Sequence, residues 1–158
     1  MPAANESTHK VIATNRKARH DYEISDTYEA GLALLGSEVK SLRSHGCNLT
    51  DGFVVERSGE LWLMDVHIAE YGYYTAGLGH EPRRPRKLLM HKKEIAKLVG
   101  RIRERGYTIV PLRMYFKEGR AKVEIALARG KRQYDKRAAL AAKDSRRDME
   151  RALKERDR

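Results

Sequence analysis

Alternation between apolar and polar residues continues through this chain to about residue 129 and then stops. It is clearest on either side of the turn "RSGE" and again around "EG" in "YTIVPLRMYFKEGRAKVEIALARG". Successive side chains of a strand point to opposite faces, so a period of two predicts half-buried β-strands. The chain is therefore predicted to form a sheet-based body followed by a C-terminal segment of different character.

The body is predicted to be mainly β, an OB-type closed or partly open barrel of five or six strands with two or three helices. Short strands with one helix inserted before the last pair favour a barrel over alternating parallel βαβ units. In the first hairpin, one face is predicted to carry Leu61, Leu63 and Asp65 and the other Trp62, Met64 and Val66.

The clearest helix lies in "HKKEIAKLVGRIRERG", where Ile95, Leu98, Val99 and Ile102 follow helical spacing and Gly106 can end it. A shorter helix is predicted in "GSEVKSLRSHG", with Ser37 as N-cap and Gly46 as the stop. Elsewhere Gly31 and Gly36 are predicted bends or bulges, and Pro111 an edge or a bulge. Tyr22 and Ile24 indicate a short strand, and residues 71–90 a long loop.

The charge of the chain indicates a polyanionic partner. Lys and Arg total 33 against 22 Asp and Glu, a net charge of +11 over 158 residues. Nucleic acid and an anionic membrane surface both fit this balance, and a solubilising surface is the alternative. No apolar run is long enough to span a membrane and the N-terminus does not resemble a signal peptide, so we expect a soluble, cytoplasmic protein.

The sequence offers no assembled catalytic or metal site. A single cysteine, Cys47, excludes an internal disulfide and a multi-cysteine zinc site, and no two of the six histidines have the i, i+4 spacing of helical metal ligands. Phosphate-binding glycine loops and the nucleophile-elbow motif are absent. We therefore expect no metal, no cofactor and no enzymatic activity. The enzyme alternative is a ribonuclease-like site drawn from His20, Glu38, His45 and His67.

RNA binding is better supported, because cations and planar side chains occur together at three places. These are "NRKARHDY", "PRRPRK" with the preceding "YGYY", and "GKRQYDKR". Cations bind phosphates, and Tyr or His can stack on unpaired bases. The alternative for Tyr71, Tyr73 and Tyr74 is that they edge the barrel.

The chain is predicted to have three parts: a flexible arm over residues 1–9, the RNA-binding barrel over 10–129, and a basic tail over 130–158. The tail's large apolar residues are only Leu140, Met149 and Leu153. It is therefore expected to be disordered in isolation. Its Ala, Leu, Lys, Arg and Glu content favours a helix once a partner is bound.

Five stretches together resemble the family of SsrA-binding proteins, also called small protein B, which partner transfer-messenger RNA in bacteria. They are "NRKARHDY", "EAGLALLGSEVKSLR", "PRRPRKLLMHKKEI", "GYTIVPLRMYF" and "ALARGKRQYDKR". The resemblance implies a barrel that binds the tRNA-like domain of this RNA and delivers it to stalled ribosomes for trans-translation. Elongation factor Tu and alanyl-tRNA synthetase would be indirect partners.

Matching positions imply the RNA-binding residues. Asn15, Glu29 and Leu89 are implied members of that surface, with Arg16, Lys17, Arg19, Tyr22, Lys87 and Lys92 as neighbours. Glu29 is an acceptor and suits a base or ribose rather than a phosphate. Leu89 could equally belong to the core.

The tail motif implies a segment that enters the vacant decoding centre and mRNA channel of the small subunit and becomes helical there. It comprises Gly130, Lys131, Arg132, Gln133, Tyr134, Asp135, Lys136 and Arg137. Many family members have His where this chain has Tyr134, which preserves stacking but not a protonated ring. A structural ribosomal or assembly protein is the alternative function. A membrane-surface binder is disfavoured because the tail lacks a continuous apolar side.

Overall fold

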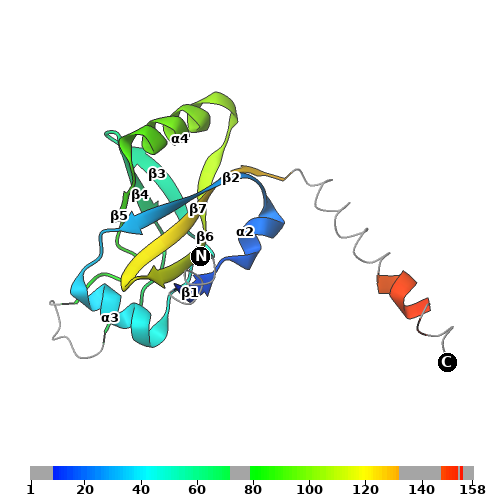
Figure 1. Ribbon diagram of the computed structural model, residues 1–158, viewed down its shortest axis with the longest axis horizontal. Helices are drawn as coiled ribbons and strands as arrows, with labels where there is room; N and C mark the ends of the chain where they lie inside the picture. The colour runs from blue at the N-terminus through cyan, green and yellow to red at the C-terminus, as the bar shows by residue number, and fades with distance from the viewer. Residues whose placement is uncertain (1–8, 72–78, 132–146, 153, 155–158) are drawn as a thin grey trace, which may run out of the picture.

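The computed structural model describes residues 9–71, 79–131, 147–152 and 154, and shows a barrel of seven strands with three helices packed on it (Figure 1). In chain order the elements of the barrel domain are β1 (His9–Thr14), α2 (Arg16–Asp21), β2 (Tyr22–Leu32), α3 (Gly36–His45), β3 (Phe53–Arg57), β4 (Glu60–Met64), β5 (Arg86–Leu89), α4 (Lys92–Arg105), β6 (Thr108–Lys117) and β7 (Arg120–Gly130). Residues 147–152 are helical as well.

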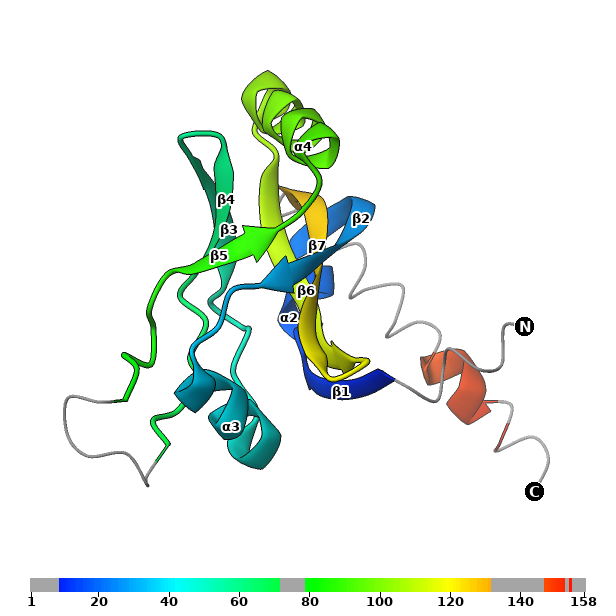
Figure 2. The same ribbon diagram turned by 60° about the vertical axis from the view of Figure 1, so that its left-hand side comes forward.

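The sheet is antiparallel and closes on itself. The strand order is β1-β6-β3-β4-β5-β2-β7, and a further pairing of β6 with β7 completes the barrel (Figure 2). One edge of β6 pairs with two strands: Ile109 pairs with β3, and the stretch from Arg113 to Lys117 pairs with β1. The predicted mainly β, closed barrel is confirmed, with seven strands in place of five or six.

The two additional strands are β1 and β5. β1 starts at His9, where the sequence suggested the end of a flexible arm, and pairs with β6. β5 lies inside the stretch predicted as a long loop and has only four residues. A run this short, with Arg86 at an inward position, has too little apolar alternation to indicate a strand.

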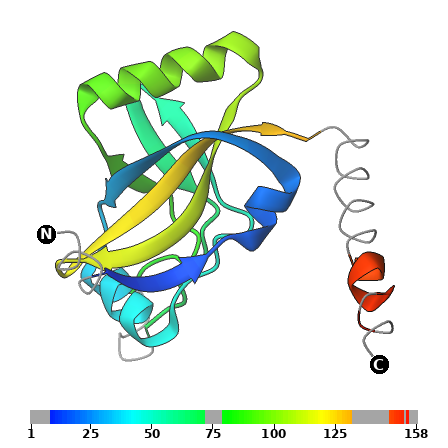
Figure 3. The same cartoon turned by 45° about the vertical axis from the view of Figure 1, so that its right-hand side comes forward.

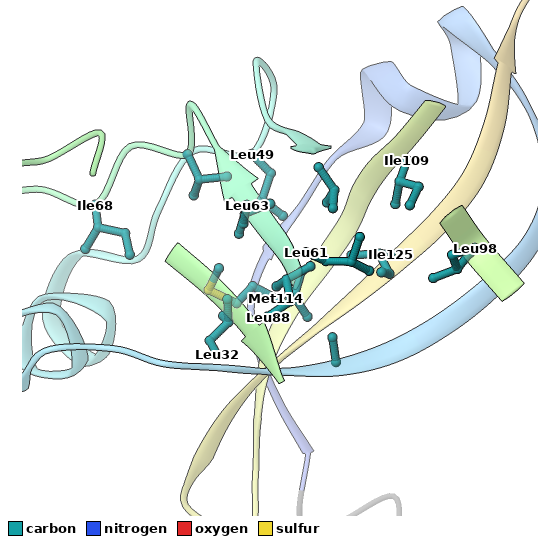
Figure 4. Packing of buried hydrophobic residues seen from close by; sticks show 14 of the residues in the cluster. Leu32, Leu49, Leu61, Leu63, Ile68, Leu88, Leu98, Ile109, Met114 and Ile125 are labelled. Atoms are coloured by element: carbon teal, nitrogen blue, oxygen red, sulfur yellow. The ribbon is translucent and has the colours of Figure 1, made fainter. Parts of the chain in front are cut away.

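The core lies inside the barrel and beneath α4. Leu61, Leu63, Ile109 and Ile125 are fully buried there (Figure 4). Leu98 of α4 is also fully buried, and α4 runs across one end of the barrel in Figures 1 and 3. The predicted amphipathic helix and its apolar side are therefore confirmed. It ends at Gly106, which has the left-handed conformation expected of this cap.

The start of α3 differs from the prediction. Its N-cap is Leu35, whose backbone N–H donates to Glu38 Oε1 at 2.9 Å. Ser37 is buried within the first turn, and its Oγ lies 2.9 Å from His80 Nδ1. The hydroxyl therefore contacts another segment and does not cap the helix. The predicted stop at Gly46 is confirmed.

Backbone geometry explains where the predicted alternation holds and where it fails. Both hairpin turns lie where predicted. The predicted faces are confirmed for residues 61–64, where Leu61 and Leu63 are buried and Trp62 and Met64 are half-buried. Asp65 has a positive φ of 54°, which breaks the period of two, so the prediction is wrong for the exposed Asp65 and the buried Val66. The register shift next to Pro111 confirms a bulge there.

The two glycines predicted as bends or bulges lie in regular structure. Gly31 pairs normally in β2, and Gly36 lies in α3. The register shift of β2 falls instead between Ile24 and Thr27. Over the described part of the chain, no helix is both long and apolar enough to cross a membrane.

Candidate nucleic-acid interface

The short helix α2 is fixed to the barrel by Asn15, a residue implied in RNA binding. The side chain of Asn15 caps α2 by accepting from Ala18 N at 3.2 Å, and its Nδ2 donates to Leu49 O at 3.2 Å and Pro111 O at 3.0 Å. Only 4% of Asn15 is exposed. The structure thus places its amide inside the protein, where it orients α2.

The cations of α2 point away from the barrel. Arg16, Lys17 and Arg19 are exposed, while Ala18 faces the barrel and is buried. Within the described residues, none of the three cations has a carboxylate within 4.0 Å. Lys17 and the half-buried Tyr22 line one surface cleft with Asp21, Thr50, Asp51 and Phe53. This surface combines exposed positive charge with a planar side chain.

Glu29 and Leu89 lie together in a second depression. It has a volume of about 650 Å³ and is lined by Thr27, Tyr28, Glu29, Gly31, Leu89, Met90, His91, Glu94 and Lys122. Leu89 is 52% exposed, which excludes the core alternative. Gly31 lies under it, and a Cβ added there would be 3.3 Å from Leu89 Cβ. Strands β2 and β5 therefore bring an acceptor and an apolar side chain to one hollow.

The carboxylate of Glu29 is held by two neighbours on β6. The Tyr115 hydroxyl donates to Glu29 Oε2, and Lys117 Nζ lies 3.5 Å from Oε1. The Tyr115 hydrogen bond is the main reason that the pKa of Glu29 lies below its ordinary value; burial opposes this shift and Lys117 adds to it. Glu29 is therefore an anionic acceptor at neutral pH.

Lys87 and Lys92 lie apart from α2. Lys87 Nζ is 2.9 Å from Glu60 Oε1 on the neighbouring strand. Lys92 starts α4 and lines a groove with Ile95, Val99 and residues of the β3–β4 hairpin. The RNA-binding residues implied by the resemblance thus fall on three surfaces: α2, the Glu29–Leu89 depression, and the β5–α4 region.

The root of the tail rests against α2. Gly130 ends β7 opposite Tyr22, and Lys131 N donates to Asp21 O at 3.0 Å. Lys131 Nζ also donates to Arg19 O at 3.2 Å. The remaining motif residues, Arg132, Gln133, Tyr134, Asp135, Lys136 and Arg137, lie outside the described residues. The candidate RNA helix and the start of the tail are therefore in direct contact.

The arginine run "PRRPRK" is divided between core and surface. Arg86 is fully buried, with its Nε donating to Glu38 Oε2 and its Nη1 donating to Val66 O at 2.6 Å. Arg84 pairs with the other oxygen of Glu38. The interpretation of this run as RNA-binding is therefore wrong for Arg86. In the structure Arg86 is on the same face of β5 as the buried Leu88, but the four-residue strand is too short for its sequence pattern to reveal this.

Residues considered for catalysis or metal binding are dispersed. Glu38 is buried in its ion pairs, whereas His20 and His45 are exposed. No group of three metal-ligating side chains occurs among the described residues. Cys47 packs near Met114, and burial raises the pKa of its thiol to about 12, so it remains protonated.

Comparison with known proteins identifies the family. Residues 12–155 match the family described as SmpB protein. The chain belongs to the SmpB family. It is 60% identical over 152 residues to the SsrA-binding protein of Acidothermus cellulolyticus, covering 95% of this chain and 94% of that protein. The SsrA-binding protein of Thermobifida fusca is 61% identical over 149 residues, covering 93% and 91%.

A solved SmpB-family structure has the same fold. It is described as "tmRNA-SmpB: a journey to the center of the bacterial ribosome" and superposes with a TM-score of 0.66 at 47% sequence identity. The match covers 83% of this chain and 95% of the other. The family resemblance inferred from the sequence is confirmed.

Proposed function

We propose that this SmpB-family chain is an RNA-binding adaptor. It binds the tRNA-like domain of transfer-messenger RNA and delivers it to stalled ribosomes for trans-translation, without catalysis of its own. Its relatives are named for binding SsrA RNA, and its structural neighbour is a tmRNA–SmpB complex. The observation that carries the proposal is the grouping of Arg16, Lys17 and Arg19 on α2 without carboxylate partners among the described residues.

The two surfaces would have different tasks in RNA recognition. The α2 cations supply phosphate contacts and the salt-dependent part of the affinity. Glu29, kept anionic by Tyr115 and Lys117, accepts hydrogen bonds from a base edge or a ribose 2′-hydroxyl. Leu89, exposed in the same depression, offers an apolar contact to an unstacked base. Asn15 contributes by holding α2 in place.

The tail from Gly130 onward is the proposed ribosome-binding segment. It enters the vacant decoding centre and mRNA channel, so the protein acts in the cytoplasm with the small-subunit rRNA as its second partner. The support for this step is the position of the root: Lys131 is hydrogen-bonded to α2, next to the proposed contact with transfer-messenger RNA. Elongation factor Tu and alanyl-tRNA synthetase act on the same RNA and are indirect partners.

Binding measurements against transfer-messenger RNA and random RNA of equal length test the proposal. At about 150 mM salt we expect the intact protein to prefer transfer-messenger RNA by at least about a hundredfold, since specific recognition exceeds purely electrostatic binding by such factors. Lack of preference would refute the proposal. Stoichiometric co-purification with all ribosomes, rather than with one small RNA, would favour the alternative of a structural ribosomal protein.

A charge-matched pair of variants tests the role of α2. Replacing Arg16, Lys17 and Arg19 by Gln should weaken transfer-messenger RNA binding and flatten its log–log salt dependence by up to about 0.7 to 0.9 per lost phosphate contact. The control replaces Lys10, Arg57 and Arg120, three exposed cations on separate strands, and should change the slope little. Equal changes in both variants would show that only net charge matters.

A further inference from the structure

Helix α4 carries a second group of exposed cations. Five of the nine Lys and Arg residues on the described barrel strands have a carboxylate within 4.0 Å, as in the pairs Lys87–Glu60 and Arg113–Glu124. On α4, in contrast, five exposed cations have no ion pair within the described residues: Lys92, Lys93, Lys97, Arg101 and Arg103. In this respect α4 is like α2, whose exposed cations also have no carboxylate within 4.0 Å among the described residues.

These cations form two rows along the helix. At 100° per residue, Lys93, Lys97 and Arg101 form one row along the outer face, where Glu104 also lies, and Lys92 and Arg103 form another on the flank nearest the β3–β4 hairpin. Between the rows lie only Ala96 and Gly100, both exposed. A Cβ added at Gly100 would meet no atom within 4 Å. The barrel therefore gives no steric reason for a glycine at this position, where glycine weakens a helix.

Small residues between two cationic rows suit the close approach of a phosphate backbone. Rows on either side can contact phosphates while nothing projects between them. The cations attract the polyanion, and the small residues allow a broad, rigid polyanion to contact both rows. Lys92 and Arg103 also border a groove of about 400 Å³ floored by Ile95 and Val99.

The position of α4 separates this surface from the Glu29–Leu89 depression. The depression meets α4 through Glu94, on a different side of the helix from Lys92 and Arg103. At its other end α4 approaches the tail root: the guanidinium groups of Arg101 and Arg129 lie 5.4 and 5.9 Å from the centre of the Tyr107 ring. In Figures 1 and 3, the end of β7 lies between α4 and α2.

We propose that the outer face and adjoining flank of α4, with Lys93 and Lys97 on one and Lys92 and Arg103 on the other, bind the phosphate backbone of ribosomal RNA near the root of the tail. The inference rests on the proposed function: if the tail binds the ribosome, ribosomal RNA is the large RNA that lies next to α4. α2 and the depression hold transfer-messenger RNA, and α4 holds the ribosome. Lys92, which the family resemblance implied for transfer-messenger RNA, is assigned in this proposal to ribosomal RNA. The surface recognises backbone rather than sequence, because its exposed cations outnumber Glu104, the exposed carboxylate on the same face.

The test compares full-length variants for binding to purified vacant ribosomes and, separately, to transfer-messenger RNA. Lys93→Gln with Lys97→Gln should weaken ribosome binding by about tenfold or more, and should reduce the loss of affinity between 50 and 200 mM salt by about tenfold, the effect of two phosphate contacts. The charge-matched control is Lys10→Gln with Arg120→Gln, at the opposite end of the barrel, which should leave ribosome binding nearly unchanged. Transfer-messenger RNA binding should be unaffected in both.

A third variant separates binding from folding. Gly100→Leu retains the charge and introduces a better helix former, so its thermal midpoint should not fall, yet its side chain fills the space between the rows and should lower ribosome affinity. Failure of the wild type to bind ribosomes would refute the proposed function itself. If the wild type binds and the Lys93/Lys97 variant matches its control, or loses affinity for transfer-messenger RNA instead, only the assignment of α4 is overturned.

Discussion

The buried pair of Glu38 and Arg86 connects parts of the chain that are far apart in sequence. Both side chains are fully buried, and Arg86 also donates to Val66 O at 2.6 Å and Pro82 O at 3.0 Å. α3, the segment after β4, and the segment leading into β5 are therefore held at one point. Ions in such a position need complete hydrogen bonding, because desolvation removes their hydration.

Replacing Glu38 by Gln should therefore destabilise the fold strongly. The change leaves the Arg86 guanidinium buried without a counter-charge, and we expect a loss of about 3–5 kcal/mol in the free energy of unfolding, measured with urea. Glu60→Gln is the matched control, because it breaks the partly exposed pair with Lys87 and should cost less than about 1 kcal/mol. Similar losses in the two variants would show that the buried pair contributes no more than a surface one.

The pKa of Glu29 provides a second prediction for single residues. Because the Tyr115 hydroxyl is the main cause of the low pKa, Tyr115→Phe should raise the pKa of Glu29, as followed by carboxyl NMR. A carboxyl pKa that is lowered by folding stabilises the fold above its unfolded value, and this contribution is lost as the pH falls through the folded value. In the variant that contribution should be smaller. An unchanged pKa would assign the shift to Lys117 and Lys122 instead.

At the scale of elements, the spacing of apolar residues predicted a helix or strand wherever one face of that element is buried along its whole length. α4 and both hairpins are long enough for their apolar spacing to exceed chance, and they lie where the sequence predicted them. α2, β1 and β5 were missed because each has four to six residues and little apolar pattern. Their positions depend on long-range contacts, such as Asn15 with Leu49 and Pro111, which local spacing cannot reveal.

The anchoring of α2 by Asn15 distinguishes a positioning role from direct RNA contact. Asn15→Ala removes the cap and two donors to buried carbonyls, and should cost about 2–3 kcal/mol of unfolding free energy. Asn48→Ala is the control, since Asn48 is exposed and its side chain accepts a local hydrogen bond from Thr50 N. RNA affinity should fall in the Asn15 variant together with α2 order, measured by amide hydrogen exchange. A loss of affinity with α2 fully protected would instead indicate direct contact.

On the scale of the whole molecule, the sequence indicated the right kinds of residues but not how they are distributed. Cations with aromatic neighbours predicted an RNA surface, yet folding puts Arg86 in the core and Asn15 under α2. It also brings Glu29 and Leu89, sixty positions apart in the chain, into one depression through the pairing of β2 with β5. Closure of the barrel determines this distribution, and no local pattern encodes it.

The junction of barrel and tail gives the last prediction. Removing residues 132–158 should leave the thermal midpoint and transfer-messenger RNA affinity nearly unchanged while abolishing peptide tagging on stalled ribosomes. Removing residues 130–158 should in addition lower the midpoint and weaken RNA binding, because it takes away the pairing of Gly130 with Tyr22 and the bonds of Lys131 to α2. Differential scanning calorimetry, RNA binding and a tagging assay measure the three effects.

The comparison of the two truncations is informative because they differ only in Gly130 and Lys131. If the shorter truncation already loses transfer-messenger RNA affinity, the tail itself contacts that RNA and the division between body and tail is wrong. If both truncations bind and melt alike, the contacts of Lys131 with Asp21 and Arg19 do not support α2. Only a difference confined to the longer truncation agrees with a tail whose first residues belong structurally to the RNA-binding helix.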